Sequence, residues 1–242
     1  MKTAPKIILL FRDADGVGSA IADALQPNHN STLQRTKTSF ELSLDRYGIK
    51  DVKASGDAIH FIDHEGLYQV SLLLLQYYDP PIIACAVNEL LASIMGENSS
   101  SMLTLILPFL VAASKLEKEM KSSIPGNHKV ALSGVQIGPE TDFTRAMIAR
   151  IQKAPPSLQI HYEPLACLLQ LVRVLKLPSF LLIGPTAQHQ SKRTPDEDIE
   201  ALYELGEFLA SSVNLCFLRD RIHWNPTKKQ RDNLEPWRAL YG

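Results

Sequence analysis

An α/β fold is predicted for this chain: a single three-layer domain in which a mixed or mostly parallel sheet carries helices on both faces, followed by a polar C-terminal tail. Short aliphatic and β-branched runs, typical of buried strands, alternate with segments of helical periodicity. The length of 242 residues suits one large domain, and 45% hydrophobic with 21% charged residues is an ordinary globular composition. The 25 basic and 26 acidic side chains nearly cancel, so charge indicates neither nucleic acid nor a membrane as partner.

The first half of the chain is predicted to be mostly strand. Strands are expected over 6–11, 32–44, 57–62, 68–76 and 81–87, with a loop at 26–31 and a short helix at 88–95. The apolar run 102–107 is assigned to a strand rather than a buried helix. Pro108 decides this, because proline fits the first position of a following helix far better than a helix interior.

The second half alternates more clearly. Helices are expected at 108–120, 141–153 and 164–175, and strands at 129–137, 158–162 and 179–183. Thr194-Pro195-Asp196-Glu197 is a capping box that begins a last helix, with apolar residues from Ile199 to Val213 on one face. Residues 219–242 hold six Lys or Arg against three Asp or Glu and few aliphatics. The α/β domain is therefore predicted to span 1–218, and 219–242 to be a flexible tail.

Cysteine usage and the apolar runs indicate a soluble intracellular protein. Cys85, Cys167 and Cys216 are far apart and odd in number, which favours free thiols in a reducing compartment over disulfides or a metal cluster. The N-terminal apolar run stops at Arg12, short of the apolar stretch of a signal peptide. The longest apolar run, 102–113, is short of the roughly 20 residues of a membrane span.

One motif suggests catalysis. Asp13-Ala14-Asp15-Gly16-Val17 directly follows the apolar run IILLF. This resembles the signature of haloacid dehalogenase-type phosphohydrolases, and the resemblance implies that Asp13 and Asp15 supply nucleophile and acid/base and hold magnesium. Ser133 would serve as the second motif of that family. The later apolar strand, however, ends Ile183-Gly184-Pro185 without the expected acids. The phosphohydrolase is the alternative hypothesis.

The other polar patterns indicate structure rather than chemistry. Gly16-Val17-Gly18 is too short for a dinucleotide fingerprint. His60, Asp63 and His64 resemble a metal set, but four residues of a strand span roughly 13 Å, too far to chelate one ion. No Ser or Cys lies in a nucleophile elbow. The sequence therefore predicts no catalytic residues, no cofactor and no metal.

The C-terminus is more informative. Leu240-Tyr241-Gly242 is a hydrophobic residue, a tyrosine and one residue that bears the carboxylate. Tyrosine supplies a large amphipathic surface at low entropic cost, and a terminal carboxylate can pair with a lysine in a receiving pocket. The three residues are predicted to act as a docking plug.

Several segments resemble proteasome assembly chaperone 1. They are 34–44, the helix–strand unit 163–182 in which Lys176 precedes Leu177-Pro178, the unit 82–95, and the terminus Leu240-Tyr241-Gly242; the first thirty residues do not match. The resemblance implies a non-catalytic subunit in the cytoplasm, and also in the nucleus. It implies a heterodimer with proteasome assembly chaperone 2, which binds 20S proteasome α-subunits and promotes α-ring assembly. It also implies that the terminal Leu-Tyr-Gly inserts between α-subunits. A third hypothesis is an α/β interaction module whose C-terminal tail has no function.

Overall fold

The structure is a computed structural model, and it describes residues 1–13, 15–97, 103–112, 131–156, 158–186, 195–222 and 224. Its main sheet has eight strands. In spatial order they are β3 (Gln34–Ser43), β4 (Lys53–Ile62), β5 (Tyr68–Gln76), β1 (Lys6–Arg12), β6 (Thr104–Ala112), β9 (Ser179–Thr186), β7 (Ser133–Ile137) and β8 (Gln152–Lys153). The four strands β5, β1, β6 and β9 are parallel to one another. β3 and β4 pair antiparallel, as do β4 and β5, and β7 pairs antiparallel with β9 but parallel with β8. β2 (Leu25–Pro27) and β10 (Leu215–Phe217) form a separate antiparallel pair.

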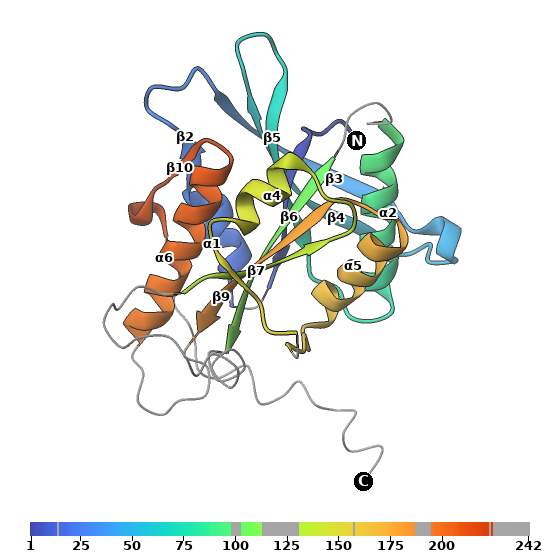
Figure 1. Cartoon of the computed structure of the whole chain (residues 1–242). Helices are drawn as coiled ribbons and strands as arrows, with labels where there is room; N and C mark the ends of the chain where they lie inside the picture. Colours follow the sequence, from blue (N-terminus) through green and yellow to red (C-terminus); the bar gives the residue numbers. More distant parts are fainter. Residues whose placement is uncertain are drawn as a thin grey trace.

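Helices cover both faces of the sheet, so the predicted three-layer α/β fold is confirmed (Figure 1). One face carries α2 (Ile82–Glu97) and α5 (Glu163–Val174), on the right of Figure 1. The other face carries α1 (Val17–Ala24), α4 (Asp142–Ile148) and α6 (Pro195–Ser212). Two short 3-10 turns, η1 (Asp45–Tyr47) and η2 (Arg219–Arg221), complete the described elements. None of the described helices is both long enough and apolar enough to cross a membrane.

The central strand β1 is buried on both sides, as its unbroken apolar sequence predicts. Ile7 and Leu9 pack under α2 and α5, while Ile8 and Leu10 pack under α1 and α6. All four side chains are at most 3% exposed. Parallel strands with helices on both faces need apolar residues at every position, not at every second one. The predicted strands 6–11 and 68–76 are confirmed for this reason.

The strand predicted at 81–87 is wrong, because residues 82–87 belong to α2. The buried side chains recur at helical spacing through the whole segment: Ile83, Ala86, Val87, Leu90, Leu91 and Ile94. A helix that lies flat on a sheet presents an apolar stripe whose first turn is hard to distinguish from a buried strand. Helix α1 is likewise absent from the elements that the sequence predicts. Its residues Ala20, Ile21 and Ala24 are buried at helical spacing in an alanine-rich run.

Pro108 is not the first residue of a helix but lies inside β6. The predicted helix 108–120 is therefore wrong over 108–112, and its remainder lies outside the described residues. β1 pairs with β6 only as far as Ile106, whereas β9 pairs with β6 up to Ala112. Pro108 lies beyond the part of β6 that pairs with β1. The N–H group that proline lacks is therefore not needed for a hydrogen bond to β1. The sequence could not show where β1 ends its pairing.

The strand predicted at 158–162 is also wrong. No strand among the described residues pairs with this segment, which runs into α5. Leu158, Ile160 and Tyr162 pack on the core from one side. Their alternation comes from an extended chain that buries one side, which imitates strand periodicity.

Two further expectations concern the ends of later elements. Gly184 and Pro185, expected to close the strand 179–183, are instead part of β9. The start of the last helix, the expected capping box at 194–197, lies largely outside the described side chains.

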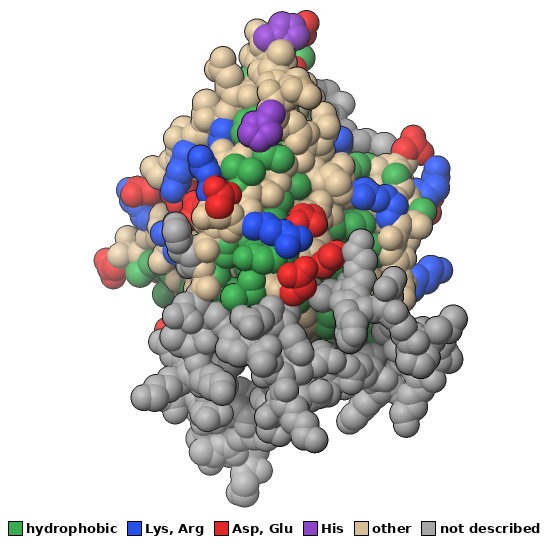
Figure 2. All heavy atoms as spheres, turned by 90° about the vertical axis from the view of Figure 1, so that its left-hand side faces the viewer, with side chains coloured by type: hydrophobic (Ala, Val, Ile, Leu, Met, Phe, Trp, Pro, Cys, Tyr) green, Lys and Arg blue, Asp and Glu red, His purple; other side chains and the backbone are tan. Residues whose placement is uncertain are grey.

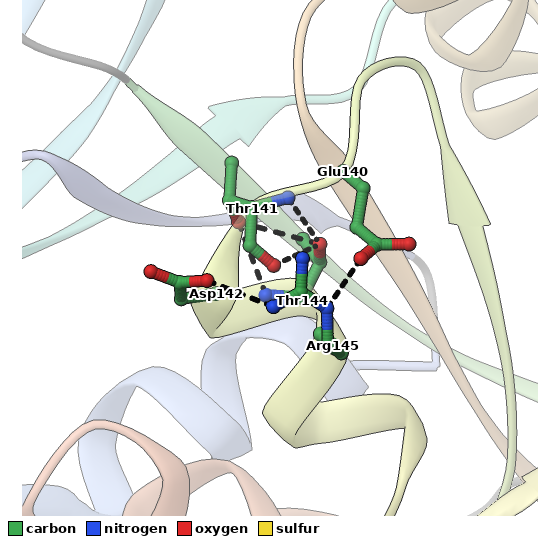
Figure 3. Close-up of polar contacts among 5 residues, drawn as sticks. All are labelled: Glu140, Thr141, Asp142, Thr144 and Arg145. Atoms are coloured by element: carbon green, nitrogen blue, oxygen red, sulfur yellow. Dashed lines mark hydrogen bonds and ion pairs between the residues drawn. The ribbon is translucent and has the colours of Figure 1, made fainter.

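Helix α4 begins where the sequence predicts, at Thr141, but it is shorter than the expected 141–153. Thr141 Oγ1 accepts from the Thr144 N–H at 3.1 Å, and Thr144 Oγ1 accepts from the Thr141 N–H at 3.0 Å (Figure 3). Arg145 adds ion pairs with Glu140 and Asp142. The helix ends at Ile148 because the chain then turns to pair β8 with β7. Reciprocal capping bonds of this kind fix the start of a helix but not its end.

Helix α5 ends in a backbone conformation that favours glycine, although Lys176 occupies the position. Lys176 has φ 52°. The N–H of Leu177 donates to the Val172 carbonyl at 3.0 Å, and the N–H of Lys176 donates to the Arg173 carbonyl at 3.2 Å. This is the left-handed C-terminal cap in which most helices carry glycine.

We expect Lys176→Gly to raise the free energy of unfolding by about 0.5–1 kcal/mol, because it removes the strain of a side chain in the left-handed region. Urea denaturation measures the change. Arg173→Gly, an exposed position inside the same helix, is the matched control and should lower stability by about 1 kcal/mol. Destabilisation by both variants would contradict the assigned cap.

Candidate functional site

The predicted docking residues Leu240, Tyr241 and Gly242 lie outside the described residues, so their docking stays a prediction. The last described residue is Trp224, whose indole Nε1 donates to the Asp15 carbonyl at 2.6 Å. Its ring packs on the core cluster beneath α1 and α6, as do Phe217 and Ile222. The last described residue therefore lies at the turn that follows β1.

Residues 219–222 also pack on the fold. Arg219 of η2 makes ion pairs with Glu207 at 2.5 Å and Glu200 at 3.9 Å and stacks on the ring of Tyr203, all from α6. The Leu218 N–H donates to the Ala24 carbonyl at the end of α1. Figure 2 shows this face of the molecule, where acidic and basic side chains lie among hydrophobic ones. The contacts of the described chain thus continue past the boundary predicted at residue 218.

The turn from Asp13 to Gly16 starts helix α1. Asp13 Oδ1 accepts from the Val17 N–H at 3.0 Å, and the Asp13 carbonyl accepts from the Gly16 N–H at 3.2 Å. Gly16 has φ 75°, which favours glycine. At Gly18 a Cβ would lie 2.1 Å from the Phe11 carbonyl, so α1 approaches β1 more closely than any side chain allows. The Asp-x-Asp-Gly sequence therefore makes a sharp strand-to-helix turn.

This geometry gives the phosphohydrolase alternative no support. Asp13 uses a carboxylate oxygen to hold the start of α1, and Asp15 uses its carbonyl to hold Trp224. Ser133, the residue expected to complete the motif, lies in β7, three strand positions from β1. At about 4.8 Å per strand this places it roughly 14 Å away. Among the described residues, no group of three or more His, Cys, Asp or Glu is arranged to hold a metal.

His60, Asp63 and His64 are not brought together. His60 is buried in β4, where its Nδ1 lies 2.9 Å from Ser71 Oγ and its ring stacks on Tyr68. Burial lowers the pKa of His60. Asp63 instead closes the turn between β4 and β5, where Oδ1 accepts from the backbone N–H groups of Glu65 and Leu67. These hydrogen bonds, that of Leu67 foremost, lower the pKa of Asp63.

An aromatic cluster that the sequence did not reveal lies beside the Asp13 turn. Tyr162 packs its ring edge-on to Phe11 and parallel to Phe109, with both centroids 5.9 Å away. Its hydroxyl is buried without a hydrogen-bond partner among the described residues. Burial, with the charges of Asp13, Tyr77 and Asp15, raises the pKa of Tyr162 well above its usual value. The side chain is therefore a neutral, unsatisfied donor at the carboxyl end of the parallel strands.

A groove of about 640 Å³ lies between α6 and the segment 149–152, which follows α4 and enters β8. Its side chains include Arg150, Glu204, Glu207 and Phe208. The Arg150 guanidinium donates to the hydroxyls of Ser211 and Ser212 at 2.8 and 3.1 Å and stacks on the Phe208 ring. The positive charge that Arg150 brings to the groove is thus bound to side chains of α6.

The segment 34–44, on which the resemblance to the chaperone partly rests, forms the edge strand β3. It pairs with β4 over its full length, Gln34 opposite Ile62 and Ser43 opposite Lys53. Most of its side chains are exposed, and only Leu42 is buried. The second segment forms the helix–strand unit α5–β9, as predicted. β3 is therefore a long and largely exposed strand at one edge of the described sheet.

We expect Asp13→Ala to lower the free energy of unfolding by about 1 kcal/mol, because the Val17 N–H at the start of α1 loses its side-chain acceptor. Asp13→Asn keeps an oxygen in the same place and should cost only a few tenths of a kcal/mol. Chemical denaturation of both variants measures this. An equal loss in both would show that the negative charge, not the hydrogen bond, holds the turn.

Tyr162→Phe is expected to leave stability at pH 7 unchanged or raise it by up to about 1 kcal/mol, because it removes a buried hydroxyl with no partner.

The raised pKa of Tyr162 leads to a second prediction, about stability at alkaline pH. Tyr162 loses its phenolic proton from about pH 10 in the unfolded chain but keeps it in the folded chain. The free energy of unfolding of the wild type therefore falls above that pH. The fall should be smaller in Tyr162→Phe. Tyr68→Phe is the control, because Tyr68 lies at the amino end of the parallel strand β5, away from Tyr162. An equal loss of stability at alkaline pH in the wild type and in Tyr162→Phe would contradict this account.

Comparison with known proteins agrees with this architecture. No curated protein sequence matches the chain as a relative. A protein of unknown function from Thermoplasma acidophilum has a similar fold, with a TM-score of 0.55 at 14% identity over 91% of this chain and 82% of that one. A PAC2 family protein from Streptomyces avermitilis has a TM-score of 0.50 at 12% identity, covering 90% and 89%. PbaB of Pyrococcus furiosus, an archaeal proteasome activator, has a TM-score of 0.50 at 10% identity, covering 91% and 88%.

At such identities the likeness shows the shared fold. The family model described as "Domain of unknown function (DUF7894)" matches residues 1–242, and the chain belongs to that family.

Proposed function

We propose that the chain is a non-catalytic subunit of the proteasome assembly chaperone type. In this proposal it pairs with a paralogous chain, of the kind called proteasome assembly chaperone 2, and together they bind 20S proteasome α-subunits and promote assembly of the α-ring in the cytoplasm and nucleus. One conjunction carries the proposal. The fold is similar to that of an archaeal proteasome activator and a PAC2 family protein, and the sequence ends in Leu240-Tyr241-Gly242.

The docking chemistry belongs to the last three residues. The Tyr241 ring would pack against the wall of a pocket between α-subunits, and the carboxylate of Gly242 would pair with a lysine of that pocket. Trp224 supports this arrangement because it fixes where the C-terminal segment leaves the domain. Residues 225–239 then connect the anchor to the plug, and a chain of that length reaches at most about 50 Å.

We expect Tyr241→Ala, and separately an extension after Gly242, to weaken α-subunit binding by roughly ten- to hundred-fold. The carboxylate contact is worth about 1.5–3 kcal/mol and the buried ring about as much, at about 1.4 kcal/mol per decade. Surface-immobilised α-subunits and a titration of each variant measure the affinity. Thermal unfolding should be unchanged in both if the terminal residues serve docking and not the fold.

Tyr241→Phe is the matched control, because it keeps the ring and removes only the hydroxyl, and it should retain most of the affinity. Unchanged affinity in both Tyr241→Ala and the extended chain would show that the terminal residues do not dock. Loss of affinity together with loss of folding would mean that the tail belongs to the domain instead.

A further inference from the structure

Strand β3 leaves one edge of the eight-stranded sheet open. In the described part of the chain it is the terminal strand, hydrogen-bonded to β4 alone. It is one of the two longest strands, with ten residues from Gln34 to Ser43. A long strand edge presents a row of unpaired N–H and carbonyl groups, which another strand can satisfy. Natural proteins usually shorten, bend or cover such an edge.

The side chains of β3 alternate between the two faces of the sheet. Arg35 donates to the Ala22 carbonyl at the end of α1, which places the odd-numbered residues on the face of α1 and α6. Phe40 and Leu42 pack with the cluster under α2 and α5, on the opposite face. Lys37 and Glu41 therefore lie on the same face of the strand, four residues apart.

Both charges are exposed and only loosely held within the chain. The Lys37 ammonium lies 3.2 Å from Asp57 Oδ2, but Arg12 lies closer to the same oxygen, at 2.6 Å. Two cations thus share one carboxylate, and a positive charge is left over. The Lys37 side chain is 52% exposed. Glu41 is 65% exposed and contacts Lys53 at 3.2 Å.

The strand is complementary to itself in one antiparallel register, centred on Ser39. In that register Lys37 lies opposite Glu41 of a second copy, and Glu41 opposite its Lys37. Thr38 lies opposite Phe40, and Arg35 opposite Ser43. Residues directly opposite in an antiparallel pair point to the same face with Cβ atoms about 4.5–5.5 Å apart, so the two-fold register forms two ion pairs of opposite charge at once.

We propose that β3 is a homodimer interface, in which two copies of this chain pair their β3 strands antiparallel about Ser39 and form one continuous sheet. The backbone hydrogen bonds of the paired edges supply the affinity, and the two symmetric Lys37–Glu41 pairs select the register. Self-association through β3 is independent of the proposed function, since it requires neither α-subunits nor the C-terminal residues.

The test exploits the symmetry of the register. Lys37→Glu places two glutamates opposite each other at both positions, and Glu41→Lys places two lysines there. Each variant alone should dimerise at least roughly tenfold more weakly than wild type. An equimolar mixture of Lys37→Glu and Glu41→Lys should dimerise again, because every glutamate of the first chain, introduced or native, then faces a lysine of the second. Sedimentation velocity from about 1 to 100 μM measures the mass.

The mixture also shows whether the variants fold, since an unfolded variant cannot restore the dimer. Lys153→Glu reverses an exposed charge in β8, at the other end of the sheet, and should dimerise like wild type. A monomeric wild type would overturn the proposal, as would single variants that dimerise normally or a mixture that stays monomeric. A wild type that gains mass only with a paralogous chain would also overturn it.

Discussion

The central strand β1 has both faces buried and a parallel strand on either side, and the remaining elements are arranged around this strand. Its neighbours β5 and β6 run in the same direction, so the chain must cross over the sheet between them, and α2 makes that crossing. Crossover connections place helices on the sheet faces, and the faces they cover must then be apolar. Ile7 and Ile8, adjacent in sequence and both fully buried on opposite faces, are the direct consequence.

The carboxyl end of β1 shows how a motif associated with catalysis can serve packing. The chain must reverse sharply from β1 into α1, and α1 must lie close enough that Gly18 contacts the Phe11 carbonyl. An aspartate that accepts from a helix N–H and a glycine at positive φ satisfy those needs. The backbone of the same turn accepts a hydrogen bond from the indole of Trp224, so the turn after β1 and the described end of the chain meet there. Beside this turn, the Tyr162 hydroxyl is buried against Phe11 and Phe109 and has no hydrogen-bond partner among the described residues.

The surfaces with a proposed function lie at the periphery of this core. Buried polar groups such as His60 and Ser71 hydrogen-bond each other and serve the fold. The open edge of β3 and the last residues of the sequence are the two parts to which an interaction is assigned, and both are polar and mixed in charge. Specificity at such surfaces comes from where charges lie opposite each other, because exposed ion pairs contribute little affinity by themselves.

The sequence by itself determined the α/β class, the central strands and the helix α5, because burial on both faces of a strand, or on one face of a helix, leaves a periodic apolar record. It also determined the start of α4, since Thr141 and Thr144 satisfy each other locally. Only the tertiary structure decided that 82–87 is helix, that Pro108 lies within β6 and that none of the described strands pairs with 158–162, because each depends on which segment lies alongside. Likewise only the tertiary structure separated Asp13 from Ser133 and placed 34–44 at the edge of the sheet. Local patterns record whether a residue is buried, whereas pairing between distant segments decides what it is buried against.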